Sequence, residues 1–469
     1  MAVGSGRSNR HSSRQQQQPP PLSFESSANA PIRVYPPDAF RASAVAASPL
    51  MQTLQSVNKP VPIVGVLSTS YDSSESAYAF ANRLIGKYAF HASEMAAACT
   101  ATKDLSPLLA SVYLYFDDTK PCVYLLGIAR SESQCFDRDA TDADVVAFER
   151  ERFKLQLIMH SCCNMLFVLQ ENPRVSMNLL KEVRALASEK QQVLTQLPSS
   201  SSSSSSKGSK KGGSSGGGPS GSLNPFAPGR CVPLVLYVVP APEEVLSAVA
   251  KNTSRSPSKS RSPTVAYCKA FETKLTTLFK SVRGGAVGSL RMRDVLTSTN
   301  LSKERRMFNV DPSHCAVIVS ARSATEEGRL EARLNDLLES IELNDDDDEM
   351  NTDEEEMELD TLLQPLEDDD TGFPRAVQYL NRFVDLLLAS TGSMAPAASS
   401  SSGSGGGGGK ESMRIELLTL AHWLKAFHSL VKTMHRMETK RKQDTAAASA
   451  GALHGSHQVY QYDQSDYPQ

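Results

Sequence analysis

Short apolar runs alternate along this chain with segments in which apolar residues recur every three or four positions. The first pair is Val61–Leu67, a run rich in β-branched residues that predicts a buried strand, and Ala77–Ile85, whose spacing predicts a helix. The other predicted strands are Ser111–Phe116, Pro121–Ile128, Met165–Leu169, Pro233–Val239 and His314–Ser320. The other predicted helices are Asp144–Met159, Val175–Leu197, Val265–Val282, Glu326–Glu342, Arg375–Leu388 and Glu411–Lys442. The alternation predicts an α/β fold whose mainly parallel sheet is covered on both faces, with a hairpin turn at the polar residues 117–120.

Polar and low-complexity stretches divide the chain into predicted regions. A disordered tail is expected over 1–57, in which Ile32–Tyr35 is either a short docking segment or a patch without a role. The α/β domain is expected over 58–341, with disordered insertions at 198–228 and 251–264. We expect an acidic linker at 342–372, then a helical appendage at 373–442 with a flexible spacer at 391–410, and finally a disordered tail at 443–469.

Composition narrows the classes of protein. The formal net charge of −3 and the pI near 6.3 argue against a general nucleic-acid binder. None of the eight cysteines forms a C-x-x-C pair, which favours reduced thiols in the core and a cytosolic or nuclear compartment, and we take the cytoplasm as the expected location. The sequence shows no apolar leader and no long apolar run, so we expect neither a secretion signal nor a membrane span.

The segment between the first strand and helix is where a nucleotide-binding fold carries its phosphate loop, G-x-x-x-x-G-K-[ST]. Anchored on Gly65, the pattern finds Ser70, Tyr71 and Asp72 where it requires the second glycine, the phosphate-binding lysine and the magnesium-binding hydroxyl. No lysine lies between Lys59 and Lys87, and the carboxylate of Asp72 would repel phosphate. The sequence therefore predicts a degenerate P-loop NTPase-like, or G-like, domain.

Two further nucleotide motifs are also missing where this fold would have them. Tyr124 stands three residues before Gly127 in place of the aspartate of D-x-x-G, and Pro240–Glu243 stands in place of N-K-x-D. We therefore expect no catalytic residues, no cofactor and no enzyme activity. Binding of a nucleotide without turnover stays open, because a bare helix N-terminus can attract phosphate.

Other candidate sites each have a structural alternative. His160–Cys163 is interpreted as a core thiol pair rather than a metal site, and His422, His428 and His435 as histidines on a helix surface. The apolar stripe Leu417–Met434 either packs on its own domain or docks to another protein. The acidic run 344–370 either binds a basic surface on a partner or keeps a linker extended, and the Ser-Pro pairs of 255–263 are either phosphorylation sites or part of a solvated insertion.

Several of these segments, in this order, resemble the N-terminal G-like half of the SMG-eight family of nonsense-mediated mRNA decay factors. The resemblance covers most of 58–340 and, more loosely, 373–440. The segments that carry it are Val61–Leu67 with the broken loop, His160–Glu171, Ser176–Leu186, Val265–Arg283, Pro312–Ser320 and the stretch RIELLTLAHWLKAFHSL.

The resemblance implies a non-catalytic regulatory subunit. Its partners would be a related G-like subunit of the SMG-nine type and the SMG-one phosphatidylinositol-kinase-like protein kinase, which the pair restrains; no direct nucleic-acid or membrane contact is implied. Members of the family carry a large C-terminal region tied to kinase restraint that this sequence does not show, so heterodimer formation and kinase docking are the retained expectations. The alternatives are a divergent GTPase that binds nucleotide as a structural ligand or switch, and an adaptor in membrane traffic.

Overall fold

The computed structural model describes fourteen stretches of the chain, joined by segments that are not described. These stretches are 31–35, 59–68, 74–90, 110–129, 141–170, 172–175, 177–197, 226–242, 244–245, 263–282, 286–292, 306–319, 372–392 and 417–452. The strands are β1 (Ile32–Tyr35), β2 (Ile63–Ser68), β3 (Ala110–Asp117), β4 (Cys122–Ala129), β5 (Met165–Leu169), β6 (Leu234–Pro240), β7 (Val287–Ser289), β8 (Phe308–Val310) and β9 (Ala316–Val319). The helices are α3 (Ser74–Ile85), α6 (Asp142–Cys162), α7 (Met177–Gln196), α9 (Pro263–Lys280), α13 (Phe373–Gly392) and α14 (Leu420–Ala452).

The strands form one mixed and mostly parallel sheet, as the sequence predicted. Its order is β1-β3-β4-β2-β5-β6-β8-β7, and β9 pairs with β6 on the same side as β8. The strand β2 lies in the middle, parallel to β4 and to β5, with Gly65 opposite Leu125 and Leu166. The antiparallel pairs are the β3–β4 hairpin, which was also predicted, and the pairing of β1 with β3.

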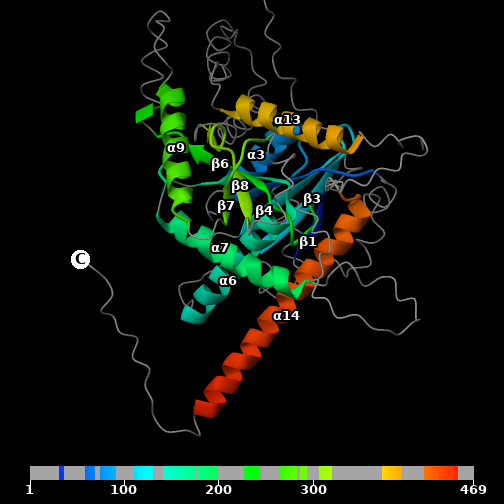
Figure 1. Ribbon diagram of the computed structural model, residues 1–469, viewed down its shortest axis with the longest axis vertical. Helices are drawn as coiled ribbons and strands as arrows, with labels where there is room; N and C mark the ends of the chain where they lie inside the picture. The colour runs from blue at the N-terminus through cyan, green and yellow to red at the C-terminus, as the bar shows by residue number, and fades with distance from the viewer. Residues whose placement is uncertain are drawn as a thin grey trace, which may run out of the picture.

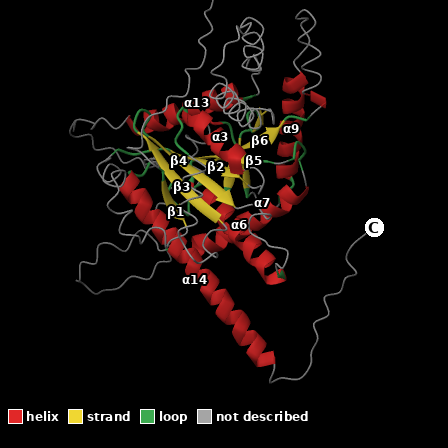
Figure 2. Cartoon of the chain, turned by 180° about the vertical axis from the view of Figure 1, so that it is seen from behind, coloured by secondary structure: helices red, strands yellow, loops and turns green. Residues whose placement is uncertain are grey.

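Helices cover both faces of this sheet and bury two apolar clusters against it. The cluster on one face includes residues of α6, α7, α9 and α14, and the cluster on the other includes residues of α3 and α13. Figure 1 shows α13 lying across the sheet on the side opposite α6, α7 and α14, and Figure 2 shows the same arrangement from behind. The chain therefore has the layered α/β architecture that the alternation of strands and helices predicted.

The helical region is not an appendage, which corrects the sequence interpretation. Phe383 and Leu387 of α13 are fully buried in one cluster, and Leu420 and Leu430 of α14 are fully buried in the other. The apolar stripe of α14 therefore packs on its own domain, one of the two alternatives left open above. Burial of large apolar side chains contributes roughly 1.5–3 kcal/mol each, so both helices belong to the folding unit.

The strand β1 contradicts the expectation that residues 1–57 form a disordered tail throughout. It pairs with β3 through Ile32↔Leu114 and Arg33↔Tyr113, and the side chains of Ile32, Val34 and Tyr35 are buried. The hydroxyl of Tyr35 donates a hydrogen bond of 3.0 Å to the Glu151 carboxylate on α6. Four residues are too few for periodicity to predict a strand. The sequence therefore left two alternatives for this segment, a short docking segment or a patch without a role.

The last helix begins and ends later than the predicted Glu411–Lys442. Before it, the chain is extended and tied to the start of β2, with Thr419 bridged to Pro60 and the Val61 amide donating to the Leu418 carbonyl. Its C-terminal end at Ala452 overlaps the expected tail 443–469, because the alanine-rich residues 445–452 have high helix propensity. The expectation of a tail is therefore wrong for residues 443–452.

Smaller differences occur at the insertions. Phe226, inside the expected insertion 198–228, is buried, and α9 begins at Pro263, inside the expected insertion 251–264. The helix α13 extends to Gly392, two residues into the expected spacer. The short strands β7 and β8 lie where the sequence indicated no regular structure. The predicted helix Glu326–Glu342, the acidic run and the Ser-Pro pairs of 255–263 lie outside the described residues, apart from Pro263.

Candidate functional site

The carboxyl end of β2 and the start of α3 form the position where a doubly wound fold binds its ligand. The strand β2 ends at Ser68 and α3 begins at Ser74, and the neighbouring strands β4 and β5 run parallel to β2. In open parallel sheets, ligands bind outside the carboxyl ends of the strands, at the point where the strand order reverses. The end of β2 and the start of α3 therefore lie at the usual ligand-binding position of a doubly wound sheet.

The sequence between β2 and α3 does not match the phosphate-loop motif in either of two registers. Gly65 lies within β2 and not in the loop, which corrects the anchoring used above, and Ser70, Tyr71 and Asp72 lie outside the described residues. Anchoring the motif on Ser68, the last residue of β2, places Ser73, Ser74 and Glu75 at the glycine, lysine and hydroxyl positions. Neither register supplies the lysine that binds the terminal phosphates.

Gly65 and Gly127 have a packing role instead. A Cβ atom on Gly65 would contact the Cys163 sulfur and lie 2.7 Å from Leu166 Cδ1, and a Cβ atom on Gly127 would lie 2.9 Å from Met159 Cγ. Both glycines thus make room for the C-terminal part of α6 and the residues that follow it. Tyr124 is buried within β4, and Pro240 ends β6, so these two motif positions belong to strands and not to ligand loops.

A buried lysine ammonium group forms a polar site at the C-terminal end of α6. Lys190 of α7 is 2% exposed, and its Nζ donates to the carbonyl oxygens of His160 (2.8 Å), Met307 (2.6 Å) and Cys231. These carbonyls come from the end of α6, from the residue before β8 and from the segment before β6. Burial lowers the pKa of Lys190 to about 8, against the opposing effect of the neighbouring thiols, so the side chain is mostly protonated at neutral pH. No pattern in the sequence indicated this site, because Lys190 looks like any other polar residue of a helix.

The thiols around Lys190 are poor nucleophiles and poor metal ligands. Cys162, Cys163 and Cys231 form no disulfide in the described part of the chain and are fully buried, as are the cysteines at 122, 268 and 315, which confirms the predicted core thiols for these six. Burial raises the pKa of Cys231 to about 12, and it also raises the pKa of Cys162 and Cys163. His160 is neutral, since burial lowers its pKa to about 4, and Nδ1 bonds the Gln156 carbonyl at 2.8 Å. Among the residues that the structure describes, no group of three His, Cys, Asp or Glu side chains could hold a metal ion.

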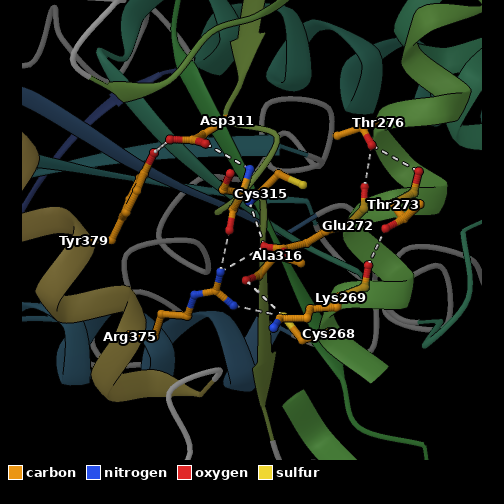
Figure 3. A network of polar contacts seen from close by, with 11 residues as sticks. Cys268, Lys269, Glu272, Thr273, Thr276, Asp311, Cys315, Ala316, Arg375 and Tyr379 are labelled. Carbon is orange, nitrogen blue, oxygen red and sulfur yellow. Dashed lines mark hydrogen bonds and ion pairs between the residues drawn. The ribbon is translucent and has the colours of Figure 1, made fainter. Parts of the chain in front are cut away.

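A second polar network joins α13 to α9 and β9 (Figure 3). The Arg375 guanidinium donates to the Glu272 carboxylate at 3.0 Å, to the Ser313 carbonyl at 2.8 Å and to the Cys268 sulfur at 3.0 Å. Glu272 also accepts the Cys315 amide at 3.1 Å, and burial raises its pKa in spite of the nearby guanidinium. The Cys268 thiol also donates to the Ala316 carbonyl of β9 at 3.8 Å, and β6 is the one described strand that pairs with β9. The bonds from Arg375 and from the Cys315 amide both end on Glu272 Oε1, so the network ties α9 and α13 to β9 and its preceding turn.

The turn before β9 continues the same network. Asp311 accepts hydrogen bonds from the Tyr379 hydroxyl (2.8 Å), the Met292 amide (3.1 Å) and the Ser313 amide (3.0 Å). His314 stacks on the Tyr379 ring at a centroid distance of 5.3 Å. Burial raises the pKa of Tyr379, and the Asp311 carboxylate raises it further. These bonds hold the first turns of α13 in place.

A surface hollow of about 300 Å³ lies between α6 and α7. Two acidic and two basic side chains line it, and one of the basic side chains, Arg152, contacts Glu149 at 3.1 Å and Glu182 at 3.3 Å. Partial burial raises the pKa of Glu182. Because the charges neutralise one another, the hollow offers no net charge to a ligand.

The remaining predicted surface residues lie where the sequence placed them. His422, His428 and His435 are exposed on α14, and His422 Nδ1 lies 2.8 Å from the Thr419 hydroxyl. None of the helices in the described part of the chain is long and apolar enough to cross a membrane. Neither a protein-family model nor a curated protein sequence matches this chain.

Proposed function

We propose that this protein is a non-catalytic regulatory and scaffold subunit built on a degenerate G-like domain, acting in nonsense-mediated mRNA decay. In this proposal it pairs with a related G-like subunit of the SMG-nine type and helps to restrain an SMG-one-type kinase. The observation that carries the non-catalytic part is the position of the phosphate loop, which has the right framework and lacks the lysine in either register. The assignment to a decay complex rests on the resemblance of the segments described above.

The strand order supports the G-like part of the proposal. The first strand of the unit, β2, is central, the next two strands form an antiparallel hairpin on one side, and β5, β6 and β9 follow in parallel on the other. The helix that follows β2 lies on the same face as α13, and the intervening helices lie on the opposite face. This is a doubly wound arrangement with its switch point at β2, which is where a nucleotide would bind.

The use of the polar residues supports a scaffold over an enzyme. Lys190, Glu272, Arg375 and Asp311 are the buried or half-buried charged groups in dense networks, and each bonds backbone groups or another side chain of the fold. Charged groups engaged in this way fix the relative positions of helices and strands. A fold stabilised throughout by such contacts is suited to presenting a fixed surface to protein partners.

The alternative is a GTPase-like protein that keeps a nucleotide as a structural ligand. The observation in its favour is the same framework, since α3 starts directly beyond the carboxyl end of β2, and backbone amides at a helix N-terminus attract phosphate without a lysine. Such binding would be weak and would not need catalytic residues.

Calorimetry on the full chain with GTP and with ATP, each with and without magnesium, separates the two readings. The proposal predicts no heat of binding and no shift of the melting temperature, under conditions in which an intact GTPase serves as the positive control. Magnesium-dependent binding at micromolar concentration would move the nucleotide-binding alternative to the front.

Affinity capture of the tagged full chain tests the assignment to the decay complex. We expect mass spectrometry to recover a second G-like subunit together with a large kinase of the phosphatidylinositol-kinase-like class. Recovery of vesicle-coat proteins without such a kinase would contradict the assignment and favour a traffic adaptor.

A further inference from the structure

The solvent side of α14 carries a row of positive charges. Lys425, Lys432, Arg436 and Lys440, called the basic stripe below, are all exposed. At 3.6 residues per turn they lie within about 80° of the helix circumference and extend over about 22 Å along its axis. The buried side chains Trp423, Phe427 and Leu430 lie on the other side of the helix. The packing of α14 therefore fixes the basic stripe toward solvent.

The four residues of the basic stripe form no ion pair within the described part of the chain. Arg436 bonds only neutral groups of its own helix, the Lys432 carbonyl and the Thr433 hydroxyl. The acidic residues of α14 are Glu438 and Asp444, and Asp444 lies one turn beyond Lys440 without forming an ion pair with it. Glu438 lies away from the stripe, where it pairs with Lys154 of α6 and with Lys442. The stripe is thus a row of uncompensated charges on a chain whose net charge is −3.

The same chain holds the opposite charge in one block. Asn344–Asp370 contains fifteen acidic residues and no lysine or arginine. The undescribed stretch 320–371 is flanked by Val319 and Gly372, so the acidic block has 24 residues of chain before it and one residue after it. At about 3.3 Å per extended residue, the 24 residues before the block span up to about 80 Å. Neither the described fold nor the proposed function assigns a role to this acidic block.

The spacing of charges on the two partners is complementary. Residues four apart on a helix are separated by about 6 Å along its axis, which is the separation of Lys432 from Arg436 and of Arg436 from Lys440. Alternate residues of an extended chain are about 6.5–7 Å apart, so a run such as Asp353–Glu358 can present carboxylates at nearly the same interval. The exposed residues of α14 between Ala421 and Gln443 include no Phe, Tyr or Trp on which a nucleic-acid base could stack. These features favour an acidic peptide over a nucleic acid.

We propose that the basic stripe of α14 is a docking surface for the chain's own acidic segment, Asn344–Asp370. The contact is intramolecular and electrostatic, and it masks the basic stripe until a stronger polyanionic competitor displaces the segment. This inference is independent of the proposed function, because it uses neither the phosphate loop nor the resemblance.

Carbodiimide cross-linking of the full chain at high dilution tests the contact, since the reagent joins only carboxylates and amines that touch. We expect monomeric products that link Lys432 and Lys440 to Asp or Glu residues of 345–360. The variant K425E/R436E keeps both reporter lysines, and it should lower these cross-links about tenfold because two attractive charges become repulsive. The matched control K269E/K274E reverses two exposed lysines of α9 and should leave them unchanged.

A peptide titration supplies the second readout. In a full-length variant with the acidic residues of 345–360 changed to Asn and Gln, the stripe is unmasked, so a labelled peptide of residues 344–370 should bind at least tenfold more tightly than to the parent chain. Equal binding to both chains, or cross-links at Lys432 and Lys440 that survive K425E/R436E, would overturn the proposal. Tighter binding of a single-stranded RNA than of the peptide to the unmasked stripe would also overturn it.

Discussion

Glycine at position 65 serves the packing between α6 and the sheet. The side chains of Leu166 and Cys163 occupy the space that a Cβ atom would need, and Gly127 on the neighbouring strand makes the corresponding room for Met159. A helix can approach a sheet this closely only where the strand residue beneath it lacks a side chain. Both glycines resemble ligand-loop glycines in the sequence, and the structure gives each of them a steric reason.

Replacing Gly65 by alanine should therefore lower stability without touching nucleotide chemistry. We expect Gly65→Ala to lower the free energy of unfolding by about 1–3 kcal/mol, the usual range for an overpacked core, measured by urea denaturation. The double variant Gly65→Ala/Cys163→Ala should recover part of that loss because it removes the contacting sulfur. An alanine variant as stable as the parent would show that α6 can move away from the sheet at little cost.

Lys190 is the residue whose removal should be felt most widely. Lys190→Met leaves three buried carbonyl groups without their donor, so we expect the free energy of unfolding to fall by about 2–4 kcal/mol. The control Lys181→Met changes an exposed lysine of the same helix and should stay within about 0.5 kcal/mol of the parent. If the two variants have the same free energy of unfolding, the desolvation of the ammonium destabilises the fold as much as its three hydrogen bonds stabilise it.

Among the elements, β1 shows how a short segment completes a sheet. It covers the edge of β3 and buries three large side chains, and its Tyr35 hydroxyl reaches α6. We expect a chain that begins at residue 31 to keep the stability of the parent, and a chain that begins at residue 59 to lose several kcal/mol and to aggregate through the bared β3 edge. Thermal unfolding and light scattering on the two truncations check this. Equal behaviour would assign β1 no part in stability.

The attachment of α13 depends on the Arg375–Glu272 contact. Arg375→Met leaves the Glu272 carboxylate buried with its backbone donors alone, and we expect a loss of about 2–4 kcal/mol together with faster amide exchange in the first turns of α13. The double variant Arg375→Met/Glu272→Gln should recover part of the loss, since no buried charge remains. Lys120→Met is the control, because Lys120 reaches α13 only through an exposed 3.2 Å contact to Asn381. Unchanged exchange in Arg375→Met would mean that apolar packing alone holds α13.

On the scale of the whole molecule, periodicity predicted the long helices and strands, and it failed for strands of only three or four residues. The strand Met165–Leu169 has the predicted bounds, and the β3–β4 hairpin is where its polar turn indicated. The strands β1, β7 and β8, of three or four residues, owe their structure to pairing partners distant in sequence, which a local pattern cannot show. For the same reason the sequence could not show that α13 and α14 complete the two faces of the sheet.

The candidate site could be predicted only in part. The motif test located the strand and the helix correctly, but it misassigned Gly65, because a glycine for phosphate and a glycine for packing look alike in one sequence. The Lys190 site was missed altogether. A lysine that binds three carbonyls from segments 30, 41 and 117 residues away leaves no local trace.

The only tryptophan of the chain is an intrinsic fluorescent probe of the contact between α14 and α6. Trp423 is 1% exposed, stacks on Phe427 at 5.1 Å and donates from its indole nitrogen to the Cys162 carbonyl at 3.4 Å, at the seam between α14 and the end of α6. Its emission therefore responds to the lifting of α14 from the domain. A conformational change at α13 or at the β1 edge that leaves α14 packed on α6 should not change the Trp423 emission. A partner that displaces α14 from the domain should therefore shift the emission of Trp423 to longer wavelength, and no added label is needed to detect its binding.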